Sequence, residues 1–377
     1  EVLAAQHLRT IQKQLGTLAQ GGMLGGSDKG TQITLITGSQ SAQARREALA
    51  KAADGSAGIV IGTHALLEDV VQFSNLGIVV IDEQHRFGVA QRAQLQKKGI
   101  QPPHVLVMTA TPIPRTLAMT AYGDLDYSVI DEMPPGRQPV KTVHRHETRR
   151  AQVMEFIRTE IDKGRQVYII FPLIEESAKL DYENLMKGYE QVKSWFPEPT
   201  YWISMVHGKQ PADQKETNMR RFVEHDTQIM VSTTVIEVGV NVPNPTVMVI
   251  ESSEKFGLSQ LHQLRGRVGR GSHESSCVLL YRAPLGMLSR ARLNAIRESN
   301  DGFVIAQRDL ELRGPGELLG TRQTGLAQMR VADLARDADL LPEVQRAAEI
   351  LLREYPDRIA PLTSRWIGTD DRYGRIG

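Results

Sequence analysis

Short apolar runs alternate with helical patterns along the first third of the chain. Strands are expected at Ile33–Ile36, Gly58–Gly62 and Ile78–Ile81, and helical spacing occurs over Val2–Leu18 and Ala42–Ala53. The expected strands end in polar turns that lead toward helices, which is the pattern of a doubly wound parallel sheet. The run Ile78–Ile81 consists of branched apolar residues, so we expect it to be buried on both faces of that sheet.

A segment rich in proline and glycine separates this pattern from a second one. Asp131–Pro139 holds three prolines and one glycine in nine residues, which cannot continue a helix or a central strand. Helices are expected beyond it at Arg149–Lys163 and Lys209–His225. The expected strands lie at 167–171, 202–207, 228–232, 247–251 and 277–281. A second α/β domain is therefore predicted.

From Leu288 onward the pattern is helical only. Ser289–Glu298 and Gly302–Leu312 are expected to form a helical hairpin around a turn at Asn300–Gly302. Arg313–Gly325 contains four glycines and a proline and is expected to be a loop, and a helix is predicted at Pro342–Tyr355.

Composition narrows the class of protein. With 41% hydrophobic and 24% charged residues over 377 positions, the chain is an ordinary globular protein. A single cysteine, Cys277, excludes a disulfide framework and fits a reducing cytoplasm, and its apolar neighbours predict a buried, inert thiol. No apolar run is long enough to cross a membrane, so no membrane partner is expected. The net charge of +1 means that any nucleic-acid site must come from local basic patches.

Two acids follow the run Ile78–Ile81. Asp82 and Glu83 come at the carboxyl end of the expected strand, where open α/β sheets bind their ligands. One carboxylate there can hold hydrated Mg²⁺ on a nucleotide phosphate, and a second can orient an attacking water.

Three further segments extend this pattern. They are TATPIPRT at Thr109–Thr116, STTVIEVGVNVP at Ser232–Pro243 and QLHQLRGRVGRG at Gln260–Gly271. With DEQH at 82–85, they resemble motifs II, III, V and VI of superfamily-two helicases and translocases, in order and spacing. The wording is similar to that of the RecG family, the ATP-dependent branch-migration helicases of bacteria. The resemblance runs from EVLAAQH at Glu1 to about the last ten residues.

The resemblance implies an α/β fold with two RecA-like doubly wound parallel-sheet domains, followed by a helical hairpin and C-terminal helices. The domains are expected at 1–130 and 141–285, with a linker at 131–140 and the hairpin, loop and last helices at 286–377. No GxxxxGK[ST] occurs in the sequence. We therefore expect the phosphate-binding loop to lie upstream of Glu1, the first domain to be truncated, and residues 1–377 alone to be inactive.

The resemblance also implies ATP and Mg²⁺ as cofactors. Asp82 would hold Mg²⁺ through water and Glu83 would activate the attacking water. The catalytic residues are expected to be Asp82, Glu83, Gln263, Arg267 and Arg270, and ATP contacts are expected from the same acids and arginines together with His85, Gly239 and Asn241. His85 could instead cap the next helix. Asn241 stands where relatives have aspartate, which removes a charge from the ribose contact.

Arg267 and Arg270 lie three positions apart, so on a helix they would share a face and act as arginine fingers toward the γ-phosphate. Arg265 would lie on another face and pair with a local acid. The alternative for all three is a solvated basic helix, which the family pattern QxxGRxxR argues against.

Contacts with DNA are implied at short polar turns after strands, which offer backbone and hydroxyl donors to phosphates without reading sequence. The residues are Thr37, Gly38, Ser39, Thr63, His64, His207, Thr233 and Thr234. Coupling of hydrolysis to movement is implied at Thr109, Thr111, Arg313, Arg322 and Gln323. For each turn, and for the glycine-rich loop, the alternative is a purely structural loop.

The expected function is therefore that of an ATP-dependent DNA helicase and double-stranded DNA translocase that remodels stalled forks and branch-migrates Holliday junctions in repair and recombination. The expected partners are branched double-stranded DNA and a single-stranded DNA-binding protein, and the protein is expected to be a monomer. Two alternatives remain: a transcription-repair coupling translocase that displaces RNA polymerase, and a DNA-binding module that does not hydrolyse ATP.

Overall fold

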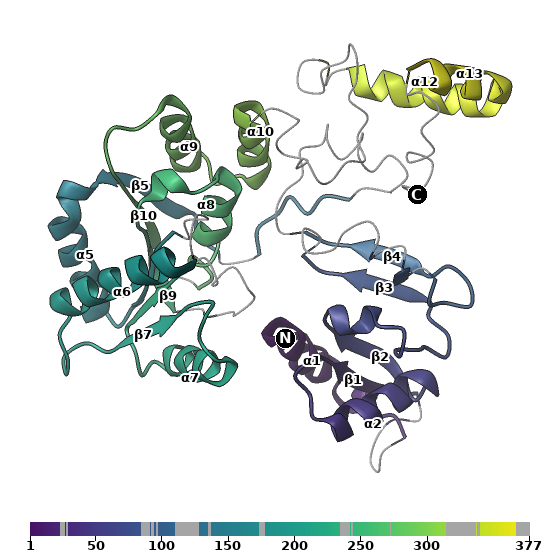
Figure 1. Ribbon diagram of the computed structural model, residues 1–377, viewed down its shortest axis with the longest axis horizontal. Coiled ribbons are helices and arrows are strands. Elements are labelled where there is room, and N and C mark those ends of the chain that lie inside the picture. Colours follow the sequence, from purple (N-terminus) through teal and green to yellow (C-terminus); the bar gives the residue numbers. More distant parts are fainter. Residues whose placement is uncertain are drawn as a thin grey trace. The chain divides into compact units, whose positions relative to one another are not determined.

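The computed structural model describes residues 1–22, 27, 29–83, 91, 94–95, 97–109, 128–134, 137–172, 178–233, 242, 244–271, 273–313, 337 and 340–366. These residues form two compact α/β units, the first up to Thr109 and the second from Ser128 onward (Figure 1). In the described part of the chain, no helix is long and apolar enough to cross a membrane.

The first unit is built on two parallel strand pairs. Its elements are α1 (Val2–Leu15), β1 (Gln32–Ile36), α2 (Ala42–Ala53), β2 (Ala57–Gly62), β3 (Ile78–Ile81) and β4 (His104–Val107). Within the described residues, β1 pairs with β2 and β3 pairs with β4, both in parallel. The prediction for α2 is confirmed at both ends, and Ser41 begins that helix by accepting a hydrogen bond from the Ala44 amide. α1 ends earlier than predicted, at Gly16, whose φ is 54°.

The prediction that Ile78–Ile81 is buried on both faces is wrong. Val79 and Ile81 are buried beside Leu67 and Leu95, whereas Ile78 is 61% exposed and Val80 55% exposed. Successive side chains of a strand point to opposite faces, and the described packing partners of β3 contact one face only.

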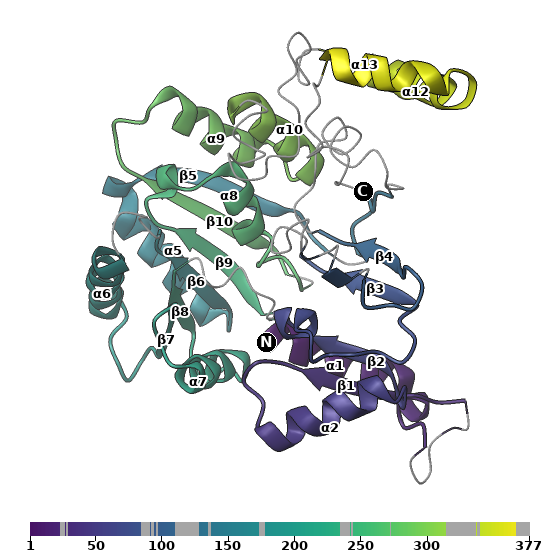
Figure 2. The same cartoon turned by 45° about the vertical axis from the view of Figure 1, so that its right-hand side comes forward.

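The second unit holds a six-stranded parallel sheet in the order β5-β10-β9-β6-β8-β7 (Figure 2). Its strands are β5 (Val140–His146), β6 (Gln166–Ile170), β7 (Ile203–Val206), β8 (Ile229–Ser232), β9 (Pro245–Ile250) and β10 (Ser275–Tyr281). All residues of β6, β8 and β9 are buried, as central strands of a doubly wound sheet require. The five strands predicted for this domain are confirmed.

β5 was not among the predicted strands. Its sequence, VKTVHRH, mixes charged and apolar residues, and only Val140 and Thr142 are buried. It lies at the edge of the sheet and pairs with β10 alone, from Val140 opposite Ser275 to His146 opposite Tyr281. A strand with one neighbour needs no continuous apolar run, so the sequence pattern concealed it.

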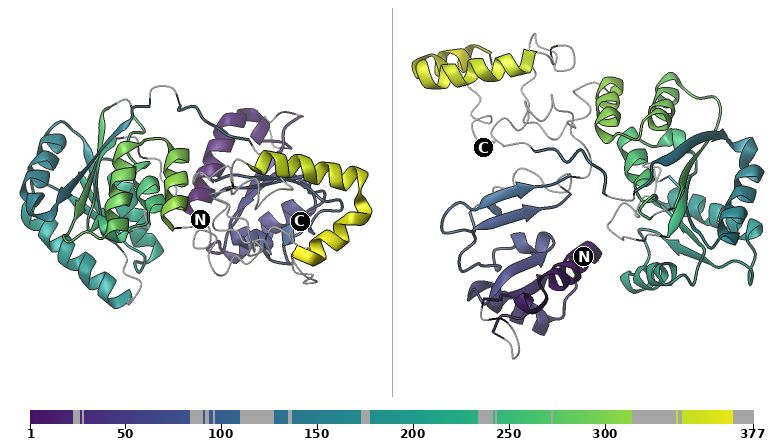
Figure 3. Two further views of the ribbon diagram at one scale, coloured as in Figure 1. Left: turned by 90° about the horizontal axis from the view of Figure 1, so that it is seen from above. Right: turned by 180° about the vertical axis from the view of Figure 1, so that it is seen from behind.

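Helices cover both faces of this sheet (Figure 3). α5 (Arg150–Asp162) and α6 (Ala178–Trp195) pack on one face, where Met154, Ile157 and Leu185 join the core beneath the strands. α7 (Ala212–Val223) contributes Phe222, whose ring centroid lies 5.0 Å from that of Tyr168 on β6. Cys277 on β10 is fully buried, which confirms the prediction of a buried thiol, and its burial raises the pKa of the thiol to about 12.

The predicted hairpin is present as α9 (Met287–Glu298) and α10 (Gly302–Arg313). Asp301 caps α10 by accepting hydrogen bonds from the amides of Phe303 and Val304, at 2.7 and 3.4 Å. The last predicted helix is α12 (Leu341–Glu354), and a further helix, α13 (Ile359–Trp366), follows it.

Arg265 fixes the hairpin to α8 (Leu258–Arg265). It is 3% exposed, and its Nη1 donates to the carbonyls of Ile296 and Ser299 at the end of α9, both at 2.7 Å. On the same helix, Ser259 Oγ donates to the buried carboxylate of Asp309 at 2.7 Å. The prediction that Arg265 pairs with a local acid is therefore wrong: it binds carbonyls left without partners where α9 ends.

We expect Arg265→Ala to lower the free energy of unfolding of the second unit by about 3 kcal/mol, because the buried carbonyl of Ile296 and the part-buried carbonyl of Ser299 lose a charged donor. Urea unfolding measures the change. The matched control is Arg290→Ala, since Arg290 is exposed and has no side-chain hydrogen bond to a described residue, and it should shift stability by less than about 0.5 kcal/mol. Equal effects of the two substitutions would contradict the assigned role.

Candidate functional site

The two acids of the first unit lie at the carboxyl end of β3. Asp82 Oδ1 accepts a hydrogen bond from the Glu83 amide at 2.9 Å, and Oδ2 lies 3.3 Å from His7 Nε2. Glu83 has a φ of 55°, which is uncommon for a residue with a side chain. Backbone strain of this kind is retained at sites where a turn aims functional groups.

The described residues contain no cluster of three or more metal-ligating side chains, so Mg²⁺ at this turn would need water and nucleotide oxygens as most of its ligands. The side chain of Asp82 is 36% exposed, and its hard carboxylate oxygens suit a cation that keeps most of its waters. Asp82 would hold the ion through water, and the ion would neutralise charge on the phosphates. His7, on α1, contacts Oδ2 of Asp82 through its Nε2 and so positions the carboxylate.

Arg267 and Arg270 do not share a helical face, and the prediction that they do is wrong. α8 ends at Arg265 with Gly266 as its C-cap, and Gly269 has a φ of 74°. Both arginines therefore lie in a turn that follows the helix, while Gln263 lies within it. Arg270 Nε donates to the Gly266 carbonyl at 3.2 Å across this turn.

Two of the predicted DNA-contact loops are built in the same way. After β1, the Gln40 side chain accepts from the Thr37 amide at 2.9 Å and donates to the Leu35 carbonyl at 2.9 Å. After β7, Gln210 accepts from His207 at 3.1 Å and donates to Met205 at 3.1 Å. We call this pair of bonds the glutamine clamp.

The glutamine clamp changes the roles expected within these loops. The amides of Thr37 and His207 are already bonded, and both residues are buried, at 3% and 7% exposed. Gly38 and Ser39 in one loop, and Gly208 and Lys209 in the other, are exposed. The exposed members are therefore the ones that can meet a phosphate. Ser39 would do so through its hydroxyl, because its amide donates to Glu1 Oε1 at 3.0 Å.

Sequence reasoning missed Gln40, Gln210, Lys209 and Tyr182. The rings of Tyr182 and His207 lie 5.3 Å apart, and Lys209 Nζ lies 5.7 Å from the Tyr182 ring. Burial lowers the pKa of His207, and Lys215 and Lys209 act in the same direction. The repeated spacing Gly-x-Gln after two strands was the available signal for the clamp; no sequence pattern pointed to Tyr182.

The other residues predicted to contact DNA or the nucleotide, or to couple hydrolysis to movement, lie after strands, at the end of a helix or outside the described residues. Thr63 begins a short 3-10 helix after β2 and accepts from the Ala65 amide at 3.5 Å, and His64 beside it is exposed. Thr233 follows β8 and is buried, and Thr109 follows β4. Arg313 ends α10. Outside the described residues lie His85, Thr111, Thr234, Gly239, Asn241, Arg322 and Gln323.

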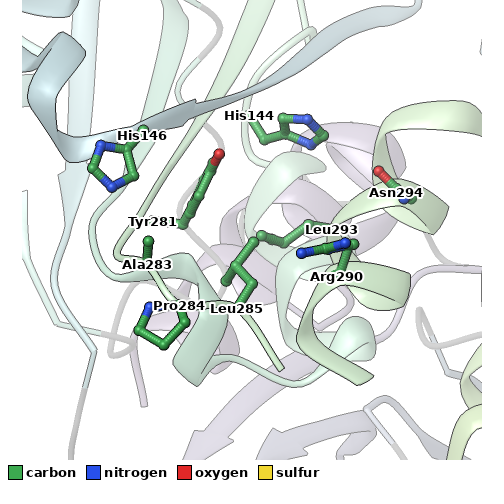
Figure 4. Close-up of a pocket in the computed structure, with 9 residues that line it drawn as sticks. All are labelled: His144, His146, Tyr281, Ala283, Pro284, Leu285, Arg290, Leu293 and Asn294. Carbon is green, nitrogen blue, oxygen red and sulfur yellow. The ribbon is translucent and has the colours of Figure 1, made fainter. Parts of the chain in front are cut away.

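A cavity of about 380 Å³ opens beside the carboxyl ends of β5 and β10, under α9 (Figure 4). Tyr281 lies between His144 and His146, in edge contact with both rings. None of the predicted site residues lines this cavity. The candidate site of the second unit is therefore formed by loops rather than by this cavity.

Comparison with known proteins gives three family matches along the chain. The DEAD/DEAH box helicase family matches residues 1–120, and the helicase conserved C-terminal domain matches residues 149–272. The family described as ATP-dependent DNA helicase RecG, domain 3, C-terminal, matches residues 299–365.

Individual relatives agree with these matches. The ATP-dependent DNA helicase RecG of Escherichia coli K12 is 48% identical over 377 residues, covering 99% of this chain and 52% of that protein. The RecG of Synechocystis is 50% identical over 357 residues, covering 95% of this chain and 41% of that protein. A structure of RecG bound to a three-way DNA junction superposes with a TM-score of 0.67 at 41% identity, covering 90% of this chain and 42% of that one.

The fold and the ordered motifs are those of a superfamily-two helicase motor, with RecA-like α/β units. The chain is homologous to RecG helicases along its whole length. It spans about half the length of the curated relatives that it matches.

His262, on α8, is expected to make the stability of the second unit depend on pH. Arg265 Nη2 lies 3.1 Å from His262 Nδ1, and because a guanidinium only donates, this nitrogen must accept. Burial, then Arg265 and Arg137, lowers the pKa of His262 to about 4. As pH falls from about 6.5 to about 4, the unfolded chain binds the proton first. Stability should fall in this window, by up to about 1.4 kcal/mol per pH unit.

Urea midpoints between pH 7 and pH 5 measure this slope. We expect His262→Gln to flatten it, because an amide oxygen can still accept from Arg265 but does not titrate. His144 and His207, whose pKa values burial also lowers, should leave a residual slope. The exposed His273→Gln is the control. A slope that His262→Gln leaves intact would assign the pH dependence to other groups.

Proposed function

We propose that the gene product is an ATP-dependent DNA helicase that translocates on double-stranded DNA and remodels forks and Holliday junctions. The observation that carries the proposal is the set of helicase motifs on two α/β units, together with the match to the RecG domain that follows them. This last match favours a RecG-type enzyme over a transcription-repair coupling translocase.

In this proposal ATP is bound with Mg²⁺, which supplies positive charge at the phosphates. Asp82 holds the ion through water, and Glu83 orients and deprotonates the attacking water. Arg267 and Arg270 stabilise charge on the γ-phosphate, and Gln263 completes the set. His85, Gly239 and Asn241 add nucleotide contacts. The domain boundaries at 1–130, 141–285 and 286–377 belong to the same proposal.

The exposed residues of the two clamped loops would bind the DNA backbone. In the loop after β7, Lys209 carries a positive charge beside the exposed Gly208. In the loop after β1, Gly38 and Ser39 are exposed. Thr109, Thr111, Arg313, Arg322 and Gln323 are proposed to couple hydrolysis to movement. A monomer that acts in the cytoplasm, with a single-stranded DNA-binding protein as a further partner, remains a prediction.

The proposal is tested by ATP hydrolysis and by unwinding of a synthetic Holliday junction with the full-length gene product. Hydrolysis should depend on DNA, and residues 1–377 expressed alone should not hydrolyse ATP. A gene product that binds junctions without hydrolysing ATP would support the binding-module alternative. Displacement of stalled RNA polymerase without junction unwinding would support the coupling translocase.

For Arg270→Ala in the gene product, we expect ATP turnover to fall by about 10³-fold while junction affinity stays unchanged, as is usual for an arginine finger. The control is Arg149→Ala, an exposed arginine that hydrogen-bonds Gln152 on the surface. Steady-state hydrolysis at saturating junction measures the loss. Retention of most of the turnover would make Arg270 a surface charge.

Removing Lys209 should weaken junction binding and lower its salt dependence. A lost phosphate contact lowers the slope of log affinity against log salt by about 0.9. Lys193→Ala is a matched control, because Lys193 Nζ also lies 5.7 Å from a tyrosine ring, that of Tyr189. Fluorescence anisotropy at several salt concentrations should separate Lys209→Ala from it. Identical slopes for both variants would remove Lys209 from the DNA interface.

A further inference from the structure

Two guanidiniums meet at one carbonyl in the second unit. Arg137 Nη2 donates to the Gly266 carbonyl at 3.4 Å, and Arg270 Nε donates to the same oxygen at 3.2 Å. Arg137 belongs to the proline-rich segment before β5, whereas Arg270 belongs to the turn after α8. Residues 133 positions apart in the sequence are thus brought to one acceptor.

Close packing keeps Arg137 at this place. Gly269 has a φ of 74°, and a Cβ on it would lie 2.8 Å from Val140 Cγ2 and 3.4 Å from the Gln138 carbonyl. Only glycine permits both this conformation and this approach. β5 begins at Val140, where its ladder with β10 starts. The backbone that carries Arg137 is therefore fixed against the turn that carries Arg267 and Arg270.

The charges at this turn repel one another. Arg270 is exposed at its surface, but partial desolvation of its guanidinium lowers its pKa, and the charges of Arg267 and Arg137 lower it further. Placing like charges together costs free energy, which a polyvalent anion between them would recover. Planar guanidiniums that approach from two segments are the groups that bind phosphate oxygens in pairs.

We propose that Arg137 is a third phosphate-binding arginine, which contacts the terminal phosphate of the bound nucleotide beside Arg267 and Arg270. The inference rests on the proposed function, because it takes ATP as the ligand of this turn. Arg137 lies outside the helicase motifs, so the inference adds a phosphate contact from the segment before β5. The alternative role is structural, a donor that only staples this segment to Gly266.

Nucleotide affinity of the gene product separates these roles. The probes are ADP alone and ADP with beryllium fluoride, which supplies a mimic of the terminal phosphate. Arg137→Ala should weaken binding of the ADP–beryllium fluoride complex by at least about 10-fold, the scale of one lost charged hydrogen bond, and change ADP affinity by less than about 2-fold. ATP turnover should fall, and junction affinity should not.

Two further variants test whether a loss of affinity in Arg137→Ala comes from the phosphate contact or from a change in the fold. Arg137→Lys keeps a donor for Gly266 but loses the planar fork, so it should keep the parent unfolding midpoint and still bind the beryllium fluoride complex more weakly than the parent does. Arg145→Ala removes an exposed arginine of β5 whose Nη1 donates to the neighbouring His144 carbonyl, and it should behave like the parent.

The outcomes distinguish the inference from the proposed function. If Arg270→Ala loses turnover and Arg137→Ala keeps the parent preference for ADP–beryllium fluoride over ADP, Arg137 is a staple and the inference is overturned. If the parent protein shows no preference for ADP–beryllium fluoride over ADP and no DNA-dependent hydrolysis, the proposed helicase function itself is wrong. Equal weakening of both ligands by Arg137→Lys would also contradict a contact with the terminal phosphate.

Discussion

The buried guanidinium of Arg265 is the interaction on which the second unit depends most. It brings a permanent positive charge to the last carbonyls of α9, where the partial negative charge of a helix end collects. Because Arg265 is also the last residue of α8, the helix that leads into the arginine turn cannot shift without the hairpin. The hydrogen bond from Ser259 to Asp309 joins the same helix to α10, so the connection has two points.

The turn after Arg265 depends on that anchorage. The chain leaves the helix at Gly266 and reverses at Gly269, and the arginines that would bind phosphate lie between and beside these glycines. A turn of this kind holds its side chains only as firmly as its ends are held. One end is fixed to the hairpin through Arg265 and the other to β5 through the contact of Gly269 with Val140.

The sequence predicted the elements with strong periodicity and failed where packing decided the outcome. α2 and the inner strands were correct because apolar spacing and a Ser41 cap specify them locally. β5 was missed because an edge strand tolerates charge, and the full burial of Ile78–Ile81 was wrong because burial depends on neighbours distant in sequence. Motif wording located Arg267 and Arg270, but their place in a turn, and the presence of Arg137 beside them, arise from contacts that no local pattern encodes.

The glutamine clamp makes the conformation of a loop independent of the charges that set the affinity of the loop for phosphate. Gln40 and Gln210 hold their loops through neutral amides, which neither titrate nor respond to ionic strength. A backbone contact made by such a loop can weaken as salt rises while the loop keeps its form. A protein that binds a polyanion through such loops can therefore change its affinity through surface charge alone, while the conformation of the loops stays the same.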